Sequence, residues 1–328
     1  MFKKKRVLIT GVAGFIGFYL AKKLCENGFF INGIDNFDPY YSVNLKKKRI
    51  EHLKKFKNFQ FKKIDIVKKN LLKNYFNKNI FDQVIHLAAQ AGDRYSLTHP
   101  YKYLDVNFLG YTNVLENVIN KKIDKFIFAS SSSVYGEQKK YPVKENYKLN
   151  PQNIYAQTKV LNENISYDLS HTNSTKFVGL RLFTIYGETG RPDIFINKYL
   201  NSAYLENKID MIDKDNYYSD YVYIDDVTEI IKKLILKRDK KKYQIFNISS
   251  NKSISITDLV KIISPQHKIS KFSIIKKFNY IDISKNHGSN NKIRRYVGYK
   301  KFINLREGIK KIIQLSKKKK YNNFLNFK

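Results

Sequence analysis

Short apolar runs alternate with longer amphipathic segments along the first half of the chain. Residues 6–10 form a β-branched run, residues 15–27 carry apolar side chains at helical spacing, and residues 29–34 form a second apolar run. This spacing predicts a strand, a helix and a second strand. Four more apolar runs, separated by segments of helical character, predict further strands over residues 59–64, 83–87, 125–129 and 176–180. Such alternation is typical of an α/β fold with a doubly wound, mainly parallel sheet, a Rossmann domain that helices cover on both faces.

The pattern becomes less regular after about residue 185. Helices are predicted over residues 194–205, 255–263 and 305–315 and a strand over 243–247, with further apolar segments near Met211 and over 220–231. We therefore expect a Rossmann domain over residues 1–185. A smaller C-terminal α/β lobe, mainly substrate-binding and partly interleaved with the first domain, is expected over residues 186–316. Residues 317–328 are rich in Lys and Asn and predict a frayed tail.

The charge of the chain first suggests a nucleic-acid partner. Its 328 residues include 62 Lys and Arg against 28 Asp and Glu, which gives a formal net charge of +34. Only 9 of the basic residues are Arg, the residue that recognises phosphates and base edges in a bidentate manner. Lys is dispersed in short groups such as 46–48, 54–55, 139–140 and 240–242. We interpret the charge as solvent-exposed surface composition and expect no specific nucleic-acid partner.

Other totals exclude several classes of protein. No run of about 18 apolar residues is present, so no membrane span is expected. The basic residues 3–6 and the apolar stretch after them look like a signal peptide, but three glycines at fixed spacing argue against one, and we expect a cytoplasmic protein. A single cysteine, Cys25, excludes an intramolecular disulfide and a cysteine-based zinc site. We expect no bound metal.

A glycine-rich turn is the first candidate binding element. Gly11, Gly14 and Gly17 follow the first predicted strand and open the first predicted helix. At this place a dinucleotide pyrophosphate can bind backbone N–H groups at the positive end of a helix, although such turns also occur for steric reasons alone. Asp35 ends the next strand, where a carboxylate can accept both hydroxyls of an adenosine ribose and repel the 2′-phosphate of NADP. The glycine turn and Asp35 together favour NAD over NADP.

Two further elements carry candidate catalytic groups. Tyr155 and Lys159 are four residues apart and lie on one face of a predicted helix. A nearby ammonium lowers the pKa of a phenol, so Tyr155 is a candidate general base, although this spacing arises by chance in a chain with 25 Tyr. Residues 130–133 are all serine and follow a predicted strand at the sheet edge where such folds bind ligands. Their hydroxyls could hold a substrate oxygen, or the loop could have no function.

In this order the motifs resemble the extended short-chain dehydrogenase/reductase family, and within it the NAD-dependent nucleotide-sugar epimerases. The resemblance covers nearly the whole chain and includes segments 86–90, 181–187, 223–226 and 297–299. It implies that the fold binds NAD as its cofactor. The residues implied to bind NAD are Gly11, Gly14, Phe15, Ile16, Gly17, Asp35, Asn36, Asp65, Ile66, Leu87, Ala88, Ala89, Gln90, Asn107, Tyr155 and Lys159.

Within the family, the residues at three positions separate the reactions. Nucleotide-sugar dehydratases carry an Asp-Glu pair at Ser132 and Ser133, and UDP-glucuronate decarboxylases carry Glu at Ser133, whereas this chain has neither acid. UDP-glucose 4-epimerases usually have Asn at the position of Thr184, and UDP-glucuronate 4-epimerases have Thr. Segments 35–46, 90–92, 94–96 and 190–193 also resemble the latter enzymes. The resemblance therefore favours conversion of UDP-glucuronate to UDP-galacturonate.

The resemblance also implies a role for each residue of the site. Tyr155 would take the proton of the sugar 4-hydroxyl while NAD takes the C4 hydride, which gives a 4-keto intermediate. Lys159 would bind the nicotinamide ribose and lower the pKa of Tyr155, and Ser131 would bind the reacting oxygen. The implied substrate-binding residues are Ser132, Ser133, Thr184, Arg191 and Arg94. Family members commonly form homodimers through the helix that contains Tyr155.

Two departures from the family pattern concern the nucleotide. Ser219 stands where relatives usually have an Arg that is associated with the diphosphate, and residues 281–283 read Ile-Asp-Ile in place of Gly-Asp-Val. Arg191 could instead form a surface salt bridge. The alternatives that stay open are a UDP-glucose or UDP-N-acetylglucosamine 4-epimerase, a UDP-glucuronate decarboxylase, and a non-catalytic RNA-binding protein on the same fold. Retention of Ser131, Tyr155 and Lys159 together favours an enzyme.

Overall fold

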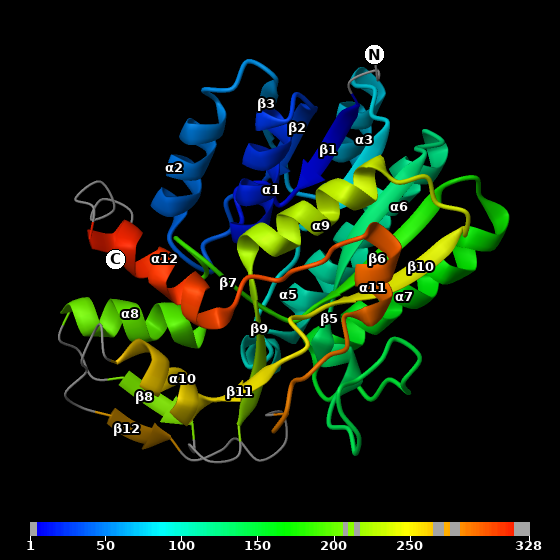
Figure 1. Cartoon of the computed structure of the whole chain (residues 1–328). Helices are drawn as coiled ribbons and strands as arrows, with labels where there is room; N and C mark the ends of the chain where they lie inside the picture. Colours follow the sequence, from blue (N-terminus) through cyan, green and yellow to red (C-terminus); the bar gives the residue numbers. More distant parts are fainter. Residues whose placement is uncertain (1–4, 206–208, 213–216, 265–271, 276–282, 318–328) are drawn as a thin grey trace.

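A parallel sheet of seven strands forms the larger part of the structure. The computed structural model describes residues 5–205, 209–212, 217–264, 272–275 and 283–317. The strands of this sheet are β1 (Arg6–Thr10), β2 (Phe30–Asp35), β3 (Phe59–Lys63), β4 (Gln83–His86), β5 (Lys125–Ser131), β6 (Lys176–Leu182) and β10 (Tyr243–Ile248). They lie in the order β10-β6-β5-β4-β1-β2-β3, and each pair of neighbours is parallel (Figure 1). The predicted doubly wound α/β fold is confirmed.

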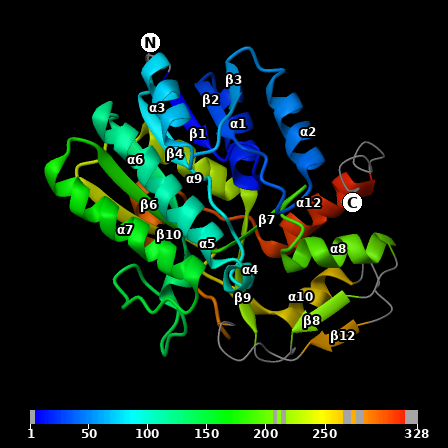
Figure 2. The same cartoon turned by 180° about the vertical axis from the view of Figure 1, so that it is seen from behind.

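Helices cover both faces of the sheet because alternate residues of a strand point to opposite faces. Val7 and Ile9 of β1 belong to one apolar core, and Leu8 between them belongs to the other. The first core also takes side chains from α1 (Phe15–Glu26), α2 (Val43–Leu53), α9 (Ile224–Leu236) and α11 (Asn291–Val297). The second takes side chains from α3 (Lys69–Lys78), α6 (Gly110–Asn120) and α7 (Ile154–Thr172), which lie behind the sheet in Figure 1 and face the viewer in Figure 2.

Short helices connect the end of β4 to α6. They are α4 (Tyr95–Thr98), α5 (Pro100–Tyr103) and the π-helix η1 (Leu104–Leu109), while a 3₁₀ turn, η2 (Ser132–Tyr135), follows β5. The π-helix has one exposed apolar side and one buried residue, Asn107. These connections place loops at the carboxyl ends of the strands.

A smaller lobe lies beside that edge of the sheet (Figure 1). It contains a three-stranded sheet of β7 (Thr184–Tyr186), β9 (Tyr218–Tyr223) and β11 (Ser253–Ser255), and a pair, β8 (Ile209–Ile212) and β12 (Phe272–Ile275). Helices α8 (Phe195–Leu205), α10 (Ile256–Ile263) and α12 (Leu305–Lys317) accompany them. The predicted segment 220–231 divides into the end of β9 and the start of α9. Helix α9 and strand β10 return to the large sheet, so the two parts interleave along the chain.

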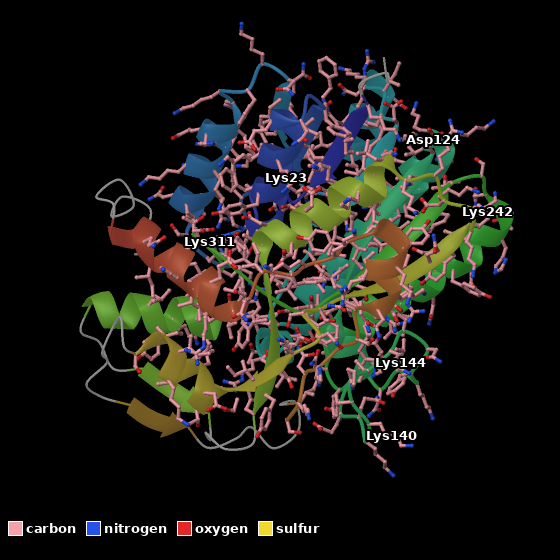
Figure 3. The ribbon with its side chains drawn as sticks, in the orientation of Figure 1. Lys23, Asp124, Lys140, Lys144, Lys242 and Lys311 are labelled. Carbon is pink, nitrogen blue, oxygen red and sulfur yellow. The ribbon has the colours of Figure 1, made fainter. Side chains whose placement is uncertain are left out.

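Within the described part of the chain, most lysines lie on the surface, but three are buried. Figure 3 shows Lys140, Lys144 and Lys242 pointing away from the body of the molecule. Lys46, Lys125 and Lys159 are buried. The expectation that residues 46–48 are all surface lysines is therefore wrong for Lys46, whose ammonium donates to the carbonyl oxygen of Asp38 at 2.6 Å.

Two of the segments discussed above extend outside the described ranges. Residues 281 and 282 of the Ile-Asp-Ile segment and residues 318–328 of the expected tail lie there. Within the described ranges, none of the helices combines the length and the apolar character that a membrane crossing requires.

The buried Lys125 generates a prediction about stability. Its ammonium contacts Asp239 at 2.7 Å and the carbonyl oxygens of Leu234 and Lys237 at 2.6 Å each, and so joins the start of β5 to the end of α9. Lys125→Met leaves these acceptors unpaired, and we expect the free energy of unfolding to fall by about 3 kcal/mol. The measurement is urea unfolding, with the exposed Lys140→Met as control, expected to change it by less than about 0.5 kcal/mol. If the free energy of unfolding is the same for Lys125→Met and Lys140→Met, the contacts of the Lys125 ammonium contribute nothing to stability.

Candidate active site

A cleft with a volume of about 900 Å³ opens at the carboxyl ends of the sheet strands. One wall carries residues that follow β1, β2, β4 and β5, and the other carries residues of the smaller lobe, including β7 and β9. Strand β1 lies between β2 and β4, and the chain leaves the sheet in opposite directions on its two sides. This is the switch point at which open α/β sheets bind ligands.

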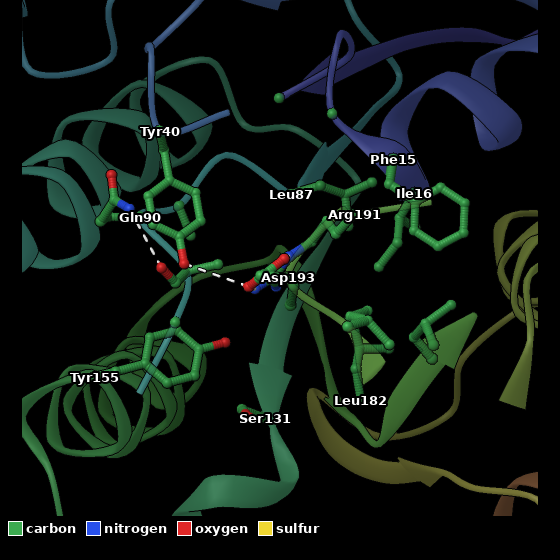
Figure 4. A pocket seen from close by; sticks show the side chains of 18 of the residues that line it. Phe15, Ile16, Tyr40, Leu87, Gln90, Ser131, Tyr155, Leu182, Arg191 and Asp193 are labelled. Carbon is green, nitrogen blue, oxygen red and sulfur yellow. Dashed lines mark hydrogen bonds and ion pairs between the residues drawn. The ribbon is translucent and has the colours of Figure 1, made fainter. Parts of the chain in front are cut away.

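The glycine turn forms the floor of the cleft beside the start of α1. Gly11 has a φ of +72°, a conformation that favours glycine. A Cβ atom on Gly17 would lie 2.2 Å from the carbonyl oxygen of Gly11, so α1 can approach the turn this closely only without a side chain. The first turn of α1 has no acidic residue, and Phe15 and Ile16 line the cleft (Figure 4). The free N–H groups of this helix end can bind an anion.

Asp35 stands at the end of β2 against this turn. Its Oδ1 accepts a hydrogen bond from the N–H of Phe37 at 2.8 Å, and its Oδ2 accepts one from the N–H of Ala13 at 3.1 Å. Burial raises the pKa of the Asp35 carboxyl, and these N–H groups and the cations Lys46 and Arg49 oppose the rise. Each oxygen keeps lone-pair capacity for a ribose hydroxyl.

Asn36 and Asp65 extend this wall of the cleft. The side-chain amide of Asn36 donates to Oδ2 of Asp65 at 3.1 Å, and Oδ1 of Asp65 accepts from the N–H of Val67 at 3.0 Å. Both side chains and the following Ile66 line the cleft. Their mutual hydrogen bonds fix a polar edge beside Asp35.

The segment after β4 lines the cleft, and Asn107 supports it from behind. Leu87, Ala88, Ala89 and Gln90 all face the cleft. Asn107 does not line it, which differs from its expected role as a cofactor ligand. Its Oδ1 accepts from the N–H of Gln90 at 2.7 Å and its amide donates to the Gln90 carbonyl at 3.0 Å. The side chain therefore positions the backbone of the wall.

Tyr155, Lys159 and Ser131 meet at the opposite side of the cleft. Asn153 caps α7 by accepting a hydrogen bond from the N–H of Ala156 at 2.8 Å, so Tyr155 lies in the first turn and Lys159 one turn later. The Lys159 ammonium lies 5.7 Å from the centroid of the Tyr155 ring. Ser131 ends β5 and is buried. The cleft thus brings the three predicted catalytic residues together, and Figure 4 shows Tyr155 and Ser131.

The electrostatics of Tyr155 differ from the expectation. Burial raises the pKa of its phenol to about 12; Asp93 adds to this rise, and Arg191 and Ser131 oppose it. Burial also lowers the pKa of Lys159 to about 8, opposed by Glu163. The pKa of the Tyr155 phenol therefore lies above its ordinary value in this state, because desolvation is the largest effect.

The residues expected to bind the substrate lie in the walls of the cleft. Ser132, Ser133, Thr184, Arg191 and Arg94 all line the cleft. The Thr184 hydroxyl lies 2.7 Å from that of Ser219, so the residue that replaces the family's Arg pairs with a candidate substrate ligand. No guanidinium stands at this position of the wall.

Arg191 lies in the cleft and is paired there. Its Nε donates to Oδ1 of Asp193 at 3.0 Å, and a second nitrogen contacts the other carboxylate oxygen. The Tyr40 hydroxyl donates to Asp193 at 3.3 Å (Figure 4). Asp193 raises the pKa of Arg191 against the opposing effect of burial. The salt bridge is therefore part of the cleft wall.

The comparison with known proteins follows this geometry. The model of the NAD dependent epimerase/dehydratase family matches residues 7–249. The chain belongs to this family. It is 37% identical over 316 residues to an uncharacterised protein of Methanocaldococcus jannaschii, which covers 94% of this chain and 95% of that protein. It is 34% identical over 314 residues to a UDP-glucuronate 4-epimerase of Thermodesulfobacterium geofontis, which again covers 94% of this chain and 95% of the relative. The crystal structure of a Bacillus cereus UDP-glucuronic acid 4-epimerase with UDP-glucuronic acid and NAD superposes with a TM-score of 0.88 at 26% identity, over 94% of this chain and 99% of that one.

Membership of this family confirms NAD as the cofactor and an enzyme of the epimerase family as the class. The cleft fits NAD on its own chemistry, because the glycines of the turn, a helix end and Asp35 line one continuous wall. Sequence reasoning did not single out Tyr40, Lys46, Asp93 or Asn286, all of which line the cleft. The first three lie inside or beside motifs that the resemblance used, and Asn286 lies in a segment without a recognised pattern.

The close approach at Gly17 predicts a loss of cofactor. In Gly17→Ala the new methyl group collides with the Gly11 carbonyl, and the start of α1 must move away from the turn. We expect the molar ratio of NAD to purified protein to fall at least about tenfold, measured by chromatography after denaturation. Lys22→Ala is the control, because this side chain belongs to the same helix, α1, and is 39% exposed. Unchanged NAD in Gly17→Ala would contradict the placement of the pyrophosphate.

Proposed function

We propose that the protein catalyses NAD-dependent 4-epimerisation of a UDP-sugar, and that this sugar is glucuronate, converted to galacturonate. The observation that carries the proposal is the convergence of Tyr155, Ser131 and Lys159 in the cleft that also contains the glycine turn. A cofactor wall and a candidate general base therefore face one another across the space available to a nucleotide sugar. The name of the relative from Thermodesulfobacterium supports the choice of substrate.

The residues divide the work of the reaction. Bound NAD supplies the acceptor and donor of the C4 hydride, together with a positive charge near the site. Tyr155 takes the proton of the 4-hydroxyl and later returns one, and Ser131 hydrogen-bonds the same oxygen. Because the phenol pKa is about 12 in the free protein, Tyr155 is protonated there at neutral pH and acts as a base only when added positive charge stabilises its phenolate.

The serine and threonine hydroxyls suit a sugar carboxylate. Ser132 and Thr184 can donate to it without supplying the acid that elimination or decarboxylation uses. Arg191 lies in the same cleft and provides a positive charge for the carboxylate or the diphosphate. Ser219 lacks the charge of the Arg that relatives usually have, so Arg191 and Arg94 supply the positive charge for the anionic groups of the substrate.

Neutral UDP-sugars are the second candidate because of Asp93. Its carboxylate accepts a hydrogen bond from the Ser133 hydroxyl at 3.2 Å, so Ser133 is not free to hold a second carboxylate. UDP-glucose and UDP-N-acetylglucosamine would avoid repulsion from Asp93.

A substrate panel tests the function. The purified protein is incubated separately with UDP-glucuronate, UDP-glucose and UDP-N-acetylglucosamine, and the C4 epimers are resolved by chromatography. We expect UDP-galacturonate to form fastest, and Tyr155→Phe to keep its NAD while its rate falls about a thousandfold.

Other outcomes of the panel select other functions. Conversion of a neutral sugar alone would overturn the glucuronate proposal, and accumulation of UDP-xylose would indicate a decarboxylase. If no UDP-sugar reacts and the protein binds RNA tightly and selectively at physiological salt, the RNA-binding alternative replaces the enzyme.

We also propose a homodimer that pairs through α7 and η1. These helices pack side by side, and they expose large apolar side chains: Leu104, Phe108, Leu109, Leu161 and Tyr167. An exposed apolar patch of this kind is typical of an interface between protein chains.

The dimer is tested by a charge placed in this patch. Leu161→Glu would bring two carboxylates together across a twofold axis, and we expect light scattering to give half the mass of the unmodified protein. Leu236→Glu is the control, because Leu236 is equally apolar and exposed but lies on α9 at the other face of the sheet. A monomer in the unmodified chain, or a dimer in both variants, would contradict the proposal.

A further inference from the structure

A chain of hydrogen bonds leads from the candidate base to Asp93. The Ser131 hydroxyl donates to the Ser133 hydroxyl at 3.1 Å, and the Ser133 hydroxyl donates to Oδ1 of Asp93 at 3.2 Å. The amide of Asn153 donates to the same oxygen at 3.4 Å. Ser131, the first residue of this chain, lines the cleft beside Tyr155 and lowers the pKa of its phenol, whereas Asp93, the last, raises it.

The position of Asp93 is fixed by its surroundings. Its backbone carbonyl accepts hydrogen bonds from the Ser96 hydroxyl at 2.6 Å and from the Ser96 N–H at 3.3 Å. Asn153 caps α7, so its contact with Asp93 joins the loop after β4 to the helix that carries Tyr155. Asp93 is therefore held in relation to Tyr155 by two separate elements.

An ionised carboxylate only accepts hydrogen bonds, and this sets the direction of the whole chain. Ser133 must donate to Asp93, so its oxygen is free to accept from Ser131. The Ser131 oxygen also accepts from the N–H of Ser133 at 3.1 Å. The Ser131 proton thus points away from Tyr155, and its remaining lone-pair capacity is available to the Tyr155 hydroxyl.

We propose that Asp93 is a positioning residue for the base: through Ser133 it fixes the direction of the Ser131 hydroxyl, and its charge opposes ionisation of Tyr155 until ligands fill the cleft. This inference rests on the proposed function for its kinetic consequence. It concerns the resting state of the site, which has a protonated Tyr155 that donates to Ser131. Ionisation of Tyr155 requires the Ser131 hydroxyl to turn and donate to the phenolate.

Other groups around Tyr155 also bear on the ionisation of its phenol. Arg191, on the segment between β7 and α8, favours the phenolate but is paired with Asp193. Lys159 on α7 directs its ammonium to the Ala129 carbonyl at 2.9 Å. The ring of Tyr103 on α5 packs edge-on at 6.1 Å between centroids, and its phenol is neutral at physiological pH because burial raises its pKa. Of the acidic groups in the described ranges, Asp93 is the one that opposes ionisation of Tyr155 directly.

The test separates the negative charge of Asp93 from its ability to accept hydrogen bonds. Asp93→Asn keeps an oxygen that can accept from Ser133 and Asn153 but removes the charge, so Tyr155 ionises at lower pH. We expect the acid limb of the pH profile of kcat/KM to move to lower pH. When kcat/KM at pH 6 is divided by the plateau value of the same protein, this fraction should rise about twofold or more. Asp93→Ser is a second neutral variant, expected to shift the limb in the same direction, and Asp93→Glu should restore the original profile.

Two further variants distinguish this role from a purely structural one. Ser133→Ala breaks the hydrogen-bond chain but keeps the charge, and we expect a lower kcat with little movement of the acid limb. Asp124→Asn removes an exposed carboxylate at the other end of the same region of the sheet, just before β5, and should leave the profile unchanged. Superimposable profiles for the unmodified protein, Asp93→Asn and Asp93→Ser would overturn the proposal.

A readout without turnover keeps this inference separate from the proposed function. In protein that carries tyrosine labelled with ¹³C at Cζ, the Tyr155 resonance is assigned by its loss in Tyr155→Phe. Its titration midpoint should be lower in Asp93→Asn than in the unmodified chain, whichever sugar the protein converts. An unchanged midpoint overturns the role of Asp93, whereas a lower midpoint in a protein that converts no UDP-sugar overturns only the proposed function.

Discussion

The burial of the Lys159 ammonium against the carbonyl of Ala129 is the interaction on which the site depends. Lys159 is 2% exposed, and a charge in such a place is costly unless a partner accepts its hydrogen bonds. The Ala129 carbonyl belongs to β5 and the ammonium to α7, so this bond at 2.9 Å fixes the helix in register with the strand. Ser131, two residues further along β5, and Tyr155, one turn earlier on α7, are thereby held facing one another.

A second layer of charge supports this contact. Glu163, one turn after Lys159, makes two hydrogen bonds to the guanidinium of Arg181 on β6, at 3.0 and 2.7 Å, and accepts another from Ser130 on β5. A buried ion pair thus joins α7 to β6, and the hydrogen bond from Ser130 joins both to β5. Removing one partner of such a pair is strongly destabilising, although the pair itself need not add net stability. Its role is to define one arrangement of α7, β5 and β6, and Glu163 also opposes the loss of charge on Lys159.

The sequence predicts the fold well because the large sheet is built from local signals. Each of its first five strands is a short apolar run with a helix after it, and the glycine turn identifies the first crossover. The prediction is weaker where tertiary contacts decide the outcome. Asn107 turns its amide to the backbone of Gln90, Lys46 is buried within a basic run, and the pKa of Tyr155 depends on burial that a sequence does not reveal. The contacts of Asp93 are not predictable from the sequence, because no spacing rule connects it to Ser133 and Asn153, which the fold brings to it from distant segments.

The central claim is that one cleft removes the hydrogen at C4 of a nucleotide sugar and returns the same hydrogen to the other face. The most direct measurement uses UDP-glucuronate that carries deuterium at C4, in ordinary water, with the product examined by NMR and mass spectrometry. The account predicts UDP-galacturonate that keeps its deuterium at C4, because a hydride that moves from carbon to carbon does not exchange with water. Product in which deuterium at C4 has been replaced by hydrogen from water would contradict the account.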